Sequence, residues 1–227
     1  MTQETQAEAA PPRRFDGKTI LISAAGGTFG REGSLYFAAA GANVIALDVS
    51  EAALKQTIDA VKAAHPNARC IGLVCDIRST AAAAAAVQAG VDAFGKIDLC
   101  WNNAGIQGEM KPTLEYSIDD FQKVMDINVV GSFVLLQAVS SSMASSGGGA
   151  IVNTASVAAL RGTPTMAAYV ASKSAVLGMT VVAAKDLAPH GIRVNAVSPA
   201  LIGPGFMWER QNALHAASGS PYFAADA

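Results

Sequence analysis

Short apolar segments alternate with longer helical segments along most of this chain. The apolar segments have the length of buried strands, and each is followed by a segment long enough to cross back over a sheet as a helix. Strands are expected at residues 18–24, 43–48, 69–76, 97–105, 149–156 and 192–200. This alternation predicts an α/β fold in a single domain, with a doubly wound parallel sheet and helices on both of its faces.

Five helices are expected between these strands, at residues 29–41, 50–65, 79–95, 117–146 and 167–191. Ser50 and Ser117 stand where N-caps are favoured, and Gly41 follows the first helix as its closing glycine. Residues 1–14 are polar and contain prolines, so we predict a mobile N-terminal extension. The folded domain is then expected over residues 15–227.

The composition argues against several classes of partner. Hydrophobic residues make up 51% of the chain and charged residues only 15%, which suits strands that are buried on both faces. The formal net charge is −2, and Lys and Arg are scattered, so we expect no nucleic-acid partner. The sequence has no run of 18 apolar residues, which predicts that the protein has no membrane span.

Cysteine and histidine usage predicts neither a disulfide nor a metal site. Cys70, Cys75 and Cys100 lie in strand-like segments, and we interpret them as small buried hydrophobic residues. An odd count without an apolar signal segment fits reduced thiols, which predicts a cytoplasmic protein. The three histidines lie far apart and have no metal-ligand spacing.

Polar and glycine-rich clusters follow four of the expected strands, where right-handed crossovers place the ligand crevice of such a sheet. The clusters are the loop SAAGGTFGREG at Ser23–Gly33, Asp48, the segment NNAG at Asn102–Gly105, and the pattern S-x12-Y-x3-K formed by Ser156, Tyr169 and Lys173. A glycine-rich loop between a strand and a helix is typical of dinucleotide binding in a Rossmann-type sheet.

The last cluster indicates proton transfer. Tyr169 and Lys173 are four residues apart, so one face of a helix carries both, and that face looks toward the strand end that holds Ser156. A free phenol has a pKa of about 10, and a nearby ammonium is expected to lower it. Tyr169 would then accept a proton from an alcohol as hydride leaves its carbon, while Ser156 hydrogen-bonds the same oxygen.

Five segments together resemble the short-chain dehydrogenase/reductase family, in its compact single-domain branch. They are NNAG, INVVGSF, IVNTASV, YVASK and IRVNAVSPA, in this order, within residues 15–202. The resemblance implies that Ser156, Tyr169 and Lys173 are catalytic and that Lys173 also binds the nicotinamide ribose. It adds Asn128 as a fourth catalytic residue, which supports a water that relays protons to Lys173. The residues alone leave Asn128 as a polar residue inside a helix, without an explained partner.

The glycine loop departs from the family pattern T-G-x3-G-x-G. At the four family positions this chain has Ser23, Ala24, Thr28 and Gly30. We expect Gly26 and Gly27 to supply the missing backbone freedom, and the start of the following helix to attract a phosphate. The Thr28 hydroxyl is expected to donate to a phosphate oxygen. The loop is therefore predicted to be a modified but working cradle, with loss of the cofactor as the alternative.

The cofactor is predicted to be NAD. A carboxylate at the end of the second strand, here Asp48, accepts both hydroxyls of the adenine ribose and repels a 2′-phosphate. Val49 and Gly27 stand where the basic residues typical of NADP binding occur. By resemblance Asp76 lies beside the adenine amine, and a role as a helix N-cap is the alternative. The residues expected to bind the cofactor are Ser23, Gly27, Thr28, Phe29, Gly30, Asp48, Asp76, Ile77, Asn103, Ala104, Gly105, Tyr169, Lys173, Pro199 and Ile202.

The substrate end is predicted to be apolar. Phe206, Met207 and Trp208 lie in a segment flanked by Gly and Pro, and we expect a flexible lid; packing against the core or another subunit is the alternative. The expected substrate contacts are Ala158, Met166, Met207 and Trp208, with Ile106 and Met110 as further pocket candidates and Arg161 as a nearby cation. Family members usually continue with another helix and strand, so either this sequence or its lid is expected to be incomplete.

The sequence as a whole predicts an NAD-dependent alcohol dehydrogenase or carbonyl reductase that acts on a small cyclic or aromatic secondary alcohol or its ketone. Two alternatives are a 3-oxoacyl thioester reductase and a catalytically silent dinucleotide-binding protein. The long helices that bear Asn128 and Tyr169 are apolar enough to pair between subunits, so a homotetramer or homodimer is expected.

Overall fold

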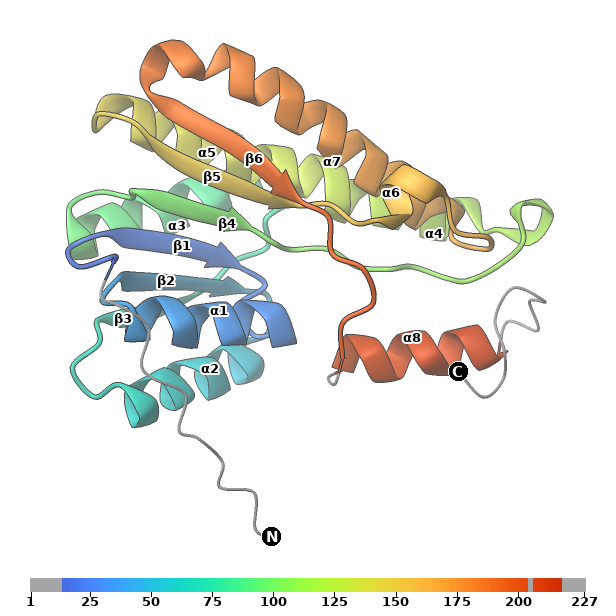
Figure 1. Ribbon diagram of the computed structural model, residues 1–227, viewed down its shortest axis with the longest axis horizontal. Coiled ribbons are helices and arrows are strands. Elements are labelled where there is room, and N and C mark those ends of the chain that lie inside the picture. The colour runs from blue at the N-terminus through green and yellow to red at the C-terminus, as the bar shows by residue number, and fades with distance from the viewer. Residues whose placement is uncertain (1–13, 204–205, 218–227) are drawn as a thin grey trace, which may run out of the picture.

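A computed structural model describes residues 14–203 and 206–217, so most of the predicted extension over residues 1–14 and the end of the predicted domain lie outside the described residues. Six strands form one sheet in the order β3-β2-β1-β4-β5-β6, and every neighbouring pair is parallel. The strands are β1 Thr19–Ser23, β2 Asn43–Asp48, β3 Cys70–Val74, β4 Leu99–Asn102, β5 Gly149–Thr154 and β6 Ile192–Val197. The predicted doubly wound parallel sheet is therefore confirmed, with its order reversing between β1 and β4 (Figure 1).

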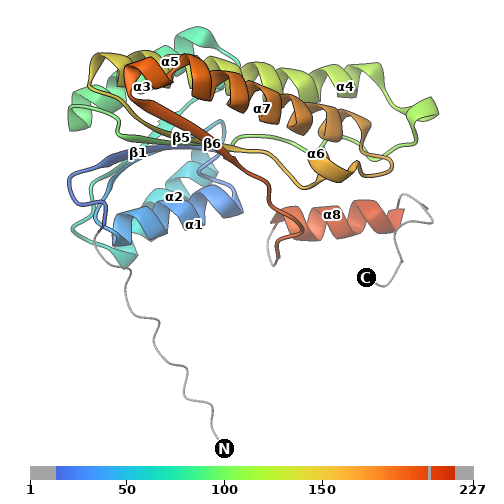
Figure 2. The same ribbon diagram turned by 45° about the horizontal axis from the view of Figure 1, so that its top comes forward.

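Helices cover both faces of the sheet. The helices are α1 Thr28–Ala39, α2 Glu51–Ala64, α3 Thr80–Phe94, α4 Ile118–Met125, α5 Ser132–Ser145, α6 Ala158–Arg161, α7 Ala167–Asp186 and α8 Phe206–Ala217. Helices α1 and α2 pack on one face, over β1 to β3, while α3, α5 and α7 form the layer on the other face (Figure 2). Successive side chains of a strand point to opposite faces, so each face has its own hydrophobic cluster. Leu21 belongs to the cluster beneath α3 and α5, and its neighbours Ile20 and Ile22 belong to the cluster beneath α1 and α2.

Serine caps fix where several helices begin. Ser50 accepts a hydrogen bond from the Ala53 N–H at the start of α2, and Ser117 accepts one from the Asp120 N–H at the start of α4, as predicted. Gly41 comes directly after the C-cap of α1 and has φ +93°, a conformation that glycine adopts without a steric penalty.

The single helix predicted over residues 117–146 is interrupted. A π-turn at Asp126–Gly131 separates α4 from α5, so the hydrogen-bond ladder widens where Asn128 lies. Wide turns of this kind occur mostly at functional sites, because they let a side chain or backbone group leave the regular helical pattern. Apolar periodicity did not reveal the turn, since the helix continues on both sides of it.

The segment predicted to be a flexible lid is helical instead. Residues Phe206–Ala217 form α8, which Figure 1 shows beyond the arrowhead ends of the strands, on the same side of the molecule as α6. The side chains of Phe206 and Met207 lie outside the described residues. The lid prediction is therefore wrong in its local structure, because a Gly- and Pro-flanked segment can still hold a helix of regular composition.

Two helical stretches, Ile118–Ser145 and Ala167–Asp186, are long and apolar enough to cross a membrane, although the sequence has no uninterrupted apolar run. Both cover the sheet: α5 packs against β4, β5 and β6, and α7 packs against β5 and β6. Helices that cover a core pass the same test of length and composition, so these two are weak indications of a membrane span.

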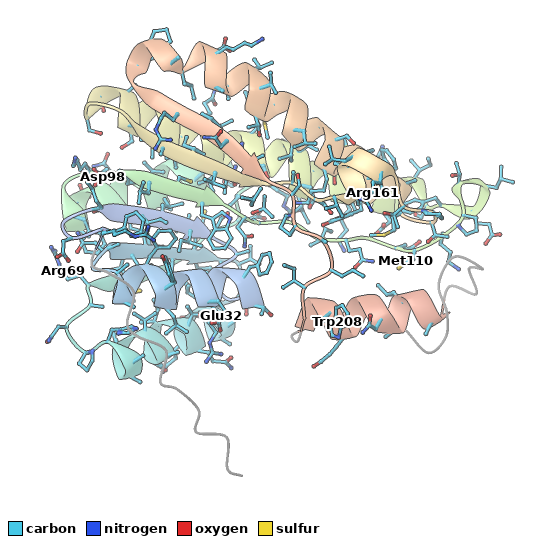
Figure 3. The ribbon with its side chains drawn as sticks, viewed as in Figure 1. Glu32, Arg69, Asp98, Met110, Arg161 and Trp208 are labelled. Atoms are coloured by element: carbon cyan, nitrogen blue, oxygen red, sulfur yellow. The ribbon has the colours of Figure 1, made fainter. Side chains whose placement is uncertain are left out.

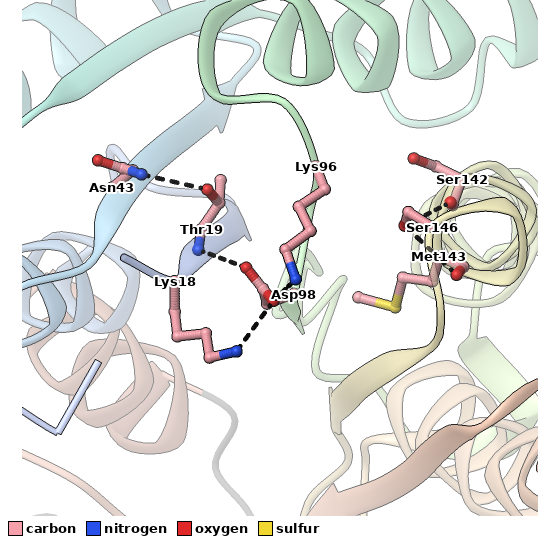
Figure 4. Close-up of polar contacts among 8 residues, drawn as sticks. All are labelled: Lys18, Thr19, Asn43, Lys96, Asp98, Ser142, Met143 and Ser146. Atoms are coloured by element: carbon pink, nitrogen blue, oxygen red, sulfur yellow. Dashed lines mark hydrogen bonds and ion pairs between the residues drawn. The ribbon is translucent and has the colours of Figure 1, made fainter. Parts of the chain in front are cut away.

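Asp98 links β1 and β4 at their N-terminal ends, opposite the strand ends where the ligand crevice is expected. Its carboxylate accepts the Thr19 N–H at 3.0 Å and forms ion pairs with Lys96 at 2.7 Å and Lys18 at 3.4 Å (Figure 4). Burial raises the pKa of this carboxyl, but the hydrogen bonds from Lys96 and from the Thr19 backbone outweigh burial and hold the pKa below its usual value.

Candidate active site

The structure brings Ser156, Tyr169 and Lys173 together at the ends of the central strands. Ser156 follows β5, and its hydroxyl accepts the Ala158 N–H at 3.2 Å at the start of α6. Tyr169 and Lys173 are one turn apart on α7, which packs against β5 and β6. The Ser156 hydroxyl lies near enough to the Tyr169 phenol to lower its pKa, so the two predicted catalytic hydroxyls belong to one site.

Lys173 is a buried cation beneath this pair. It is 4% exposed, and its Nζ donates a hydrogen bond to the Thr154 carbonyl oxygen at 2.7 Å. Nζ lies 5.8 Å from the centre of the Tyr169 ring. Burial disfavours the ammonium and lowers the pKa of Lys173 to about 8. The charge of Lys173 is therefore sensitive to its surroundings near neutral pH.

The pKa of Tyr169 differs from the expectation. Burial raises the pKa of Tyr169 above its ordinary value, and the opposing effect of the Ser156 hydroxyl, which lowers this pKa, is smaller. The expected lowering by Lys173 does not dominate, because the ammonium turns toward the Thr154 carbonyl and the phenol is taken out of water. Ser156 therefore favours the phenolate more directly than Lys173 does.

Asn128 has partners that the sequence did not suggest. Its side-chain amide donates to the Ile106 carbonyl at 2.8 Å and to the Ser172 hydroxyl at 3.0 Å, and its oxygen accepts the Ile106 N–H at 2.8 Å. Ser172 donates in turn to the Tyr169 carbonyl at 2.8 Å. Asn128 thus fastens the π-turn both to the loop after β4 and to the catalytic turn of α7.

Gly105 leaves space between these groups. A Cβ atom at this position would lie 3.1 Å from Asn128 Oδ1 and 3.2 Å from Lys173 Nζ. The predicted NNAG segment therefore runs against the catalytic groups, and any side chain at Gly105 would press on them.

The predicted phosphate cradle begins α1, but its strained residue is not a glycine. Ala24 has φ +52°, while Gly27 is extended with φ −81°. Gly26 is needed for space, since its Cβ would lie 2.7 Å from the Ala53 Cβ. Gly30 is also needed for space, because its Cβ would overlap the Ala24 carbonyl oxygen. Of the freedom expected from Gly26 and Gly27, neither glycine uses a positive φ, and Gly26 instead provides room for Ala53 and Asp48.

The start of α1 still suits a phosphate. Helix α1 begins at Thr28, and its N-cap residue, Gly27, offers no side chain to bond the first N–H groups. Uncapped N–H groups at a helix start bind anions, helped by the helix dipole. Thr28 is exposed, and the Phe29 ring lies 6.2 Å from the Trp101 ring, so neither is in the hydrophobic core.

Asp48 ends β2 beside this loop and is held in place by backbone donors. One carboxylate oxygen accepts the Gly26 N–H at 2.9 Å, and the other accepts the Ser50 N–H at 2.9 Å. Each oxygen retains a further acceptor site. The carboxylate is therefore presented in a fixed orientation, as recognition of two ribose hydroxyls requires, so the residues present fit NAD.

Several predicted cofactor contacts have structural roles. Ser23 is fully buried, and its hydroxyl accepts the N–H groups of Asn103 and Ala104 at 2.9 and 3.0 Å, so it braces the loop from behind. Ile77 is in the hydrophobic cluster beneath α3 and α5. The Pro199 carbonyl accepts the Val157 N–H at 3.0 Å, which joins the loops after β6 and β5.

Asp76 and Ile202 keep side chains near solvent. Both Asp76 oxygens bond to the Arg78 guanidinium, which lowers the pKa of this carboxyl. Ser79, rather than Asp76, caps α3, so the alternative role of Asp76 as that helix cap is wrong. Ile202 is half exposed at the end of the loop after β6.

The predicted substrate residues lie around the same strand ends. Ala158, Met166 and Met110 are buried, whereas Trp208 on α8 is partly buried with its ring against Gly203. Figure 3 shows Met110 and Arg161 on the same side of the molecule as α8, where Trp208 lies. Met207 lies outside the residues whose side chains are described.

Sequence reasoning missed Ser172 and the backbone carbonyl of Thr154, which orient Asn128 and Lys173. A carbonyl has the same chemistry in every residue, so the sequence carried no signal for Thr154. Ser172 precedes Lys173 within the YVASK segment, and its hydroxyl was the available signal.

Comparisons with known proteins agree with this geometry. The family model for "short chain dehydrogenase" matches residues 18–214. Levodione reductase of Leifsonia aquatica is 37% identical over 196 residues, which are 86% of this chain and 73% of that protein. Cyclohexanol dehydrogenase of an Acinetobacter species is 36% identical over 192 residues, 83% of this chain and 74% of the relative. The crystal structure of NAD+-bound xylitol dehydrogenase superimposes with a TM-score of 0.90 at 46% sequence identity. The match covers 94% of this chain and 81% of the xylitol dehydrogenase chain.

Proposed function

Because this chain belongs to the short-chain dehydrogenase family, we propose that Tyr169 is the proton-transferring group of its reaction. The protein is an NAD-dependent oxidoreductase that interconverts an alcohol and a ketone. The observation that carries the proposal is the buried Lys173, whose Nζ lies 5.8 Å from the centre of the Tyr169 ring and donates to the Thr154 carbonyl, two residues before Ser156. These are the groups that an alcohol needs in order to lose its hydroxyl proton.

Each residue of the site has a separate task. Tyr169 takes the proton of the substrate hydroxyl during oxidation and returns it during reduction. Ser156 donates a hydrogen bond to the oxygen whose charge changes. Lys173, with Nζ 5.8 Å from the centre of the Tyr169 ring, supplies the nearby positive charge. NAD, held by Asp48 and by the start of α1, would supply the acceptor for the hydride of the carbinol carbon. Asn128 holds the loop after β4 at a fixed distance from α7.

The proposed substrate is a small secondary alcohol with an apolar skeleton, cyclic or open-chain. Support comes from the buried apolar side chains Ala158, Met166 and Met110 beside the site. Cyclohexanol dehydrogenase and xylitol dehydrogenase, which are similar to this chain, are named for a cyclic and an open-chain alcohol.

Replacing Tyr169 with Phe tests the mechanism. Turnover of cyclohexanol or xylitol, followed as NADH production, should fall by at least about 100-fold, the usual weight of general acid–base catalysis. NADH binding, followed by fluorescence, should be retained because the ring remains. Tyr36→Phe is the matched control, since this phenol lies half exposed on α1 and contacts Arg14. Equal turnover in Tyr169→Phe and the wild type would refute the role.

The same assays separate the alternatives. A catalytically silent protein would bind NADH but would turn over neither cyclohexanol nor xylitol. A 3-oxoacyl thioester reductase would reduce acetoacetyl thioesters and leave cyclohexanol and xylitol unchanged. Asp48 favours the alcohol dehydrogenase, because its carboxylate opposes the 2′-phosphate of NADP, which thioester reductases usually take.

We further propose that the outer face of α5 and α7 pairs with a second copy of the chain. Phe133 on α5, Val182 on α7 and Val130 just before α5 are each at least half exposed and line a mostly apolar groove. Val181, beside Val182, is also more than half exposed. Apolar surface of this extent favours association. Phe133→Glu should reduce the mass measured by analytical ultracentrifugation, whereas Leu114→Glu, at a fully exposed position elsewhere, should not. An unchanged mass in Phe133→Glu would count against this face.

We keep the cytoplasm as the proposed compartment. Cys70, Cys75 and Cys100 are free thiols, and burial raises the pKa of Cys100 to about 12, so its thiol is unreactive. Fractionation of cells that express the chain tests this proposal, and recovery with the membrane fraction would contradict it.

A further inference from the structure

Gln107 is a buried glutamine whose side-chain amide has no hydrogen-bond partner among the described residues. The residue is 2% exposed, and both Nε2 and Oε1 lack a partner. A buried polar group without a partner typically costs about 1–3 kcal/mol, so native proteins rarely keep one unless it serves a ligand or an ordered water. An alternative apolar residue of similar volume, such as Met, would avoid this cost.

Two other residues have orphaned atoms, but neither is comparable. Asn102 lacks a partner only at its oxygen, because its amide nitrogen donates to the Ser132 carbonyl and to Asn153. Ser140 belongs to α5, in the apolar groove between α5 and α7. Within the described part of the chain, Gln107 is the one buried side chain with two unpartnered polar atoms, Nε2 as a donor and Oε1 as an acceptor.

The backbone fixes Gln107 next to the catalytic groups. The N–H and the carbonyl of the preceding residue, Ile106, are both hydrogen-bonded to the Asn128 side chain. Gly105, two residues away, abuts Lys173, and two trans peptides separate Cα atoms by at most about 7.6 Å. At the other end of the loop, the Lys111 N–H donates to the Thr165 carbonyl at 2.9 Å, just before Met166 and α7.

The polar groups that come after Gln107 are occupied with one another. The Asp120 carboxylate accepts the Tyr116 hydroxyl at 2.9 Å and the Glu109 N–H at 2.8 Å. These groups are bonded to one another, and none of them is bonded to the Gln107 amide. An amide that offers one donor and one acceptor is complementary to a hydroxyl group, which can use both.

We propose that Gln107 determines substrate specificity by hydrogen-bonding a second hydroxyl of the substrate, on a carbon near the one that reacts. The substrate class is then a diol or a longer polyol rather than a simple alcohol. Apolar contacts from Met166 and Ala158 hold the carbon skeleton, and the amide distinguishes its second oxygen. This inference rests on the alcohol dehydrogenase function proposed above and makes its substrate class more specific.

Matched pairs of alcohols test the inference. The pairs are cyclohexanol with 1,2-cyclohexanediol, and 2-butanol with 2,3-butanediol, which differ in one hydroxyl. For the wild type, kcat/KM should be higher for each diol. In Gln107→Met and Gln107→Leu the ratio of diol to simple alcohol should fall about 10- to 100-fold, which is the weight of one to two hydrogen bonds to a buried amide. For the simple alcohol, kcat/KM of each variant should remain within about threefold of the wild-type value, because this substrate has no second hydroxyl to bond to the amide.

Gln88→Met provides the control, because Gln88 is exposed on α3 and bonds only to Asp92 among its described contacts. NADH fluorescence titration confirms that each variant folds and binds the cofactor. The stabilisation of the NADH complex by each diol, measured as a shift in Tm, gives a readout that does not depend on turnover. This shift should be present in the wild type and absent in Gln107→Met.

The outcomes are distinct. A ratio that does not change in the variants overturns the inference, and the amide then holds an ordered water only. Equal losses on both members of a pair also overturn it, since the role is then structural. If the wild type turns over no alcohol, the proposed function fails, and the Tm shift still decides whether Gln107 binds the second hydroxyl.

Discussion

Ala24→Gly is expected to stabilise the protein. Ala24 has φ +52°, in the left-handed region where a Cβ typically costs about 1–2 kcal/mol. Glycine removes this strain but adds freedom to the unfolded chain, which opposes folding by roughly 0.5–1 kcal/mol. The net gain is up to about 1.5 kcal/mol, since the Ala24 side chain is only partly buried and its methyl contributes little. For a chain of this size the gain corresponds to a rise in Tm of up to about 6 °C.

The neighbouring residue provides the matched control. Ala25 is fully buried, belongs to the hydrophobic cluster beneath α1 and α2, and has no positive φ. Ala25→Gly therefore loses a buried methyl as well as rigidity and should lower stability by about 1–2 kcal/mol. Urea unfolding followed by circular dichroism, at one protein concentration, compares the variants. If Ala24→Gly were destabilised as Ala25→Gly is, the strain argument would be refuted.

Three further predictions concern charge, cofactor choice and close packing. Asp98→Asn should lower the free energy of unfolding by up to about 1 kcal/mol at neutral pH, because the ion pairs are lost while the Thr19 N–H keeps an acceptor. Since the folded pKa of Asp98 is below its ordinary 3.8, the wild-type advantage is present above that value and disappears as acid protonates the folded carboxyl; urea midpoints measured down this range check it. Asp48→Ala combined with Val49→Arg should move the kcat/KM preference from NAD toward NADP by at least about tenfold, and an unchanged preference would contradict the role of Asp48. Gly30→Ala should reduce stability by about 1–3 kcal/mol and weaken NADH binding in fluorescence titrations, because the new Cβ overlaps backbone that cannot move aside.

The order and type of the main elements could be predicted because apolar patterning is local. Strands buried on both faces, serine caps and a closing glycine all act within a few residues of one another. The positions of Asp48, Ser156, Tyr169 and Lys173 followed from the rule that parallel strands end at one edge.

Other features depend on groups that are distant in sequence or identical in every residue. The partners of Asn128 are the backbone of Ile106 and the hydroxyl of Ser172, which meet only after the sheet has formed. The pKa of Tyr169 depends on where the Lys173 ammonium turns, and the Thr154 carbonyl decides that direction. The glycine loop misled for a similar reason: Gly26 provides room for Ala53 and Asp48, and the unusual φ belongs to Ala24.

The π-turn at Asp126–Gly131 makes this stretch intolerant of changes in length. Each helical residue rotates the chain by about 100°, so one residue more or fewer changes which side of α4 meets α7. Removing one residue would restore the regular α-helical hydrogen-bond ladder but would rotate α4 so that a different side of it faces α7. Substitutions along this stretch can accumulate singly, whereas insertions and deletions would separate the two halves of the helix from their separate partners.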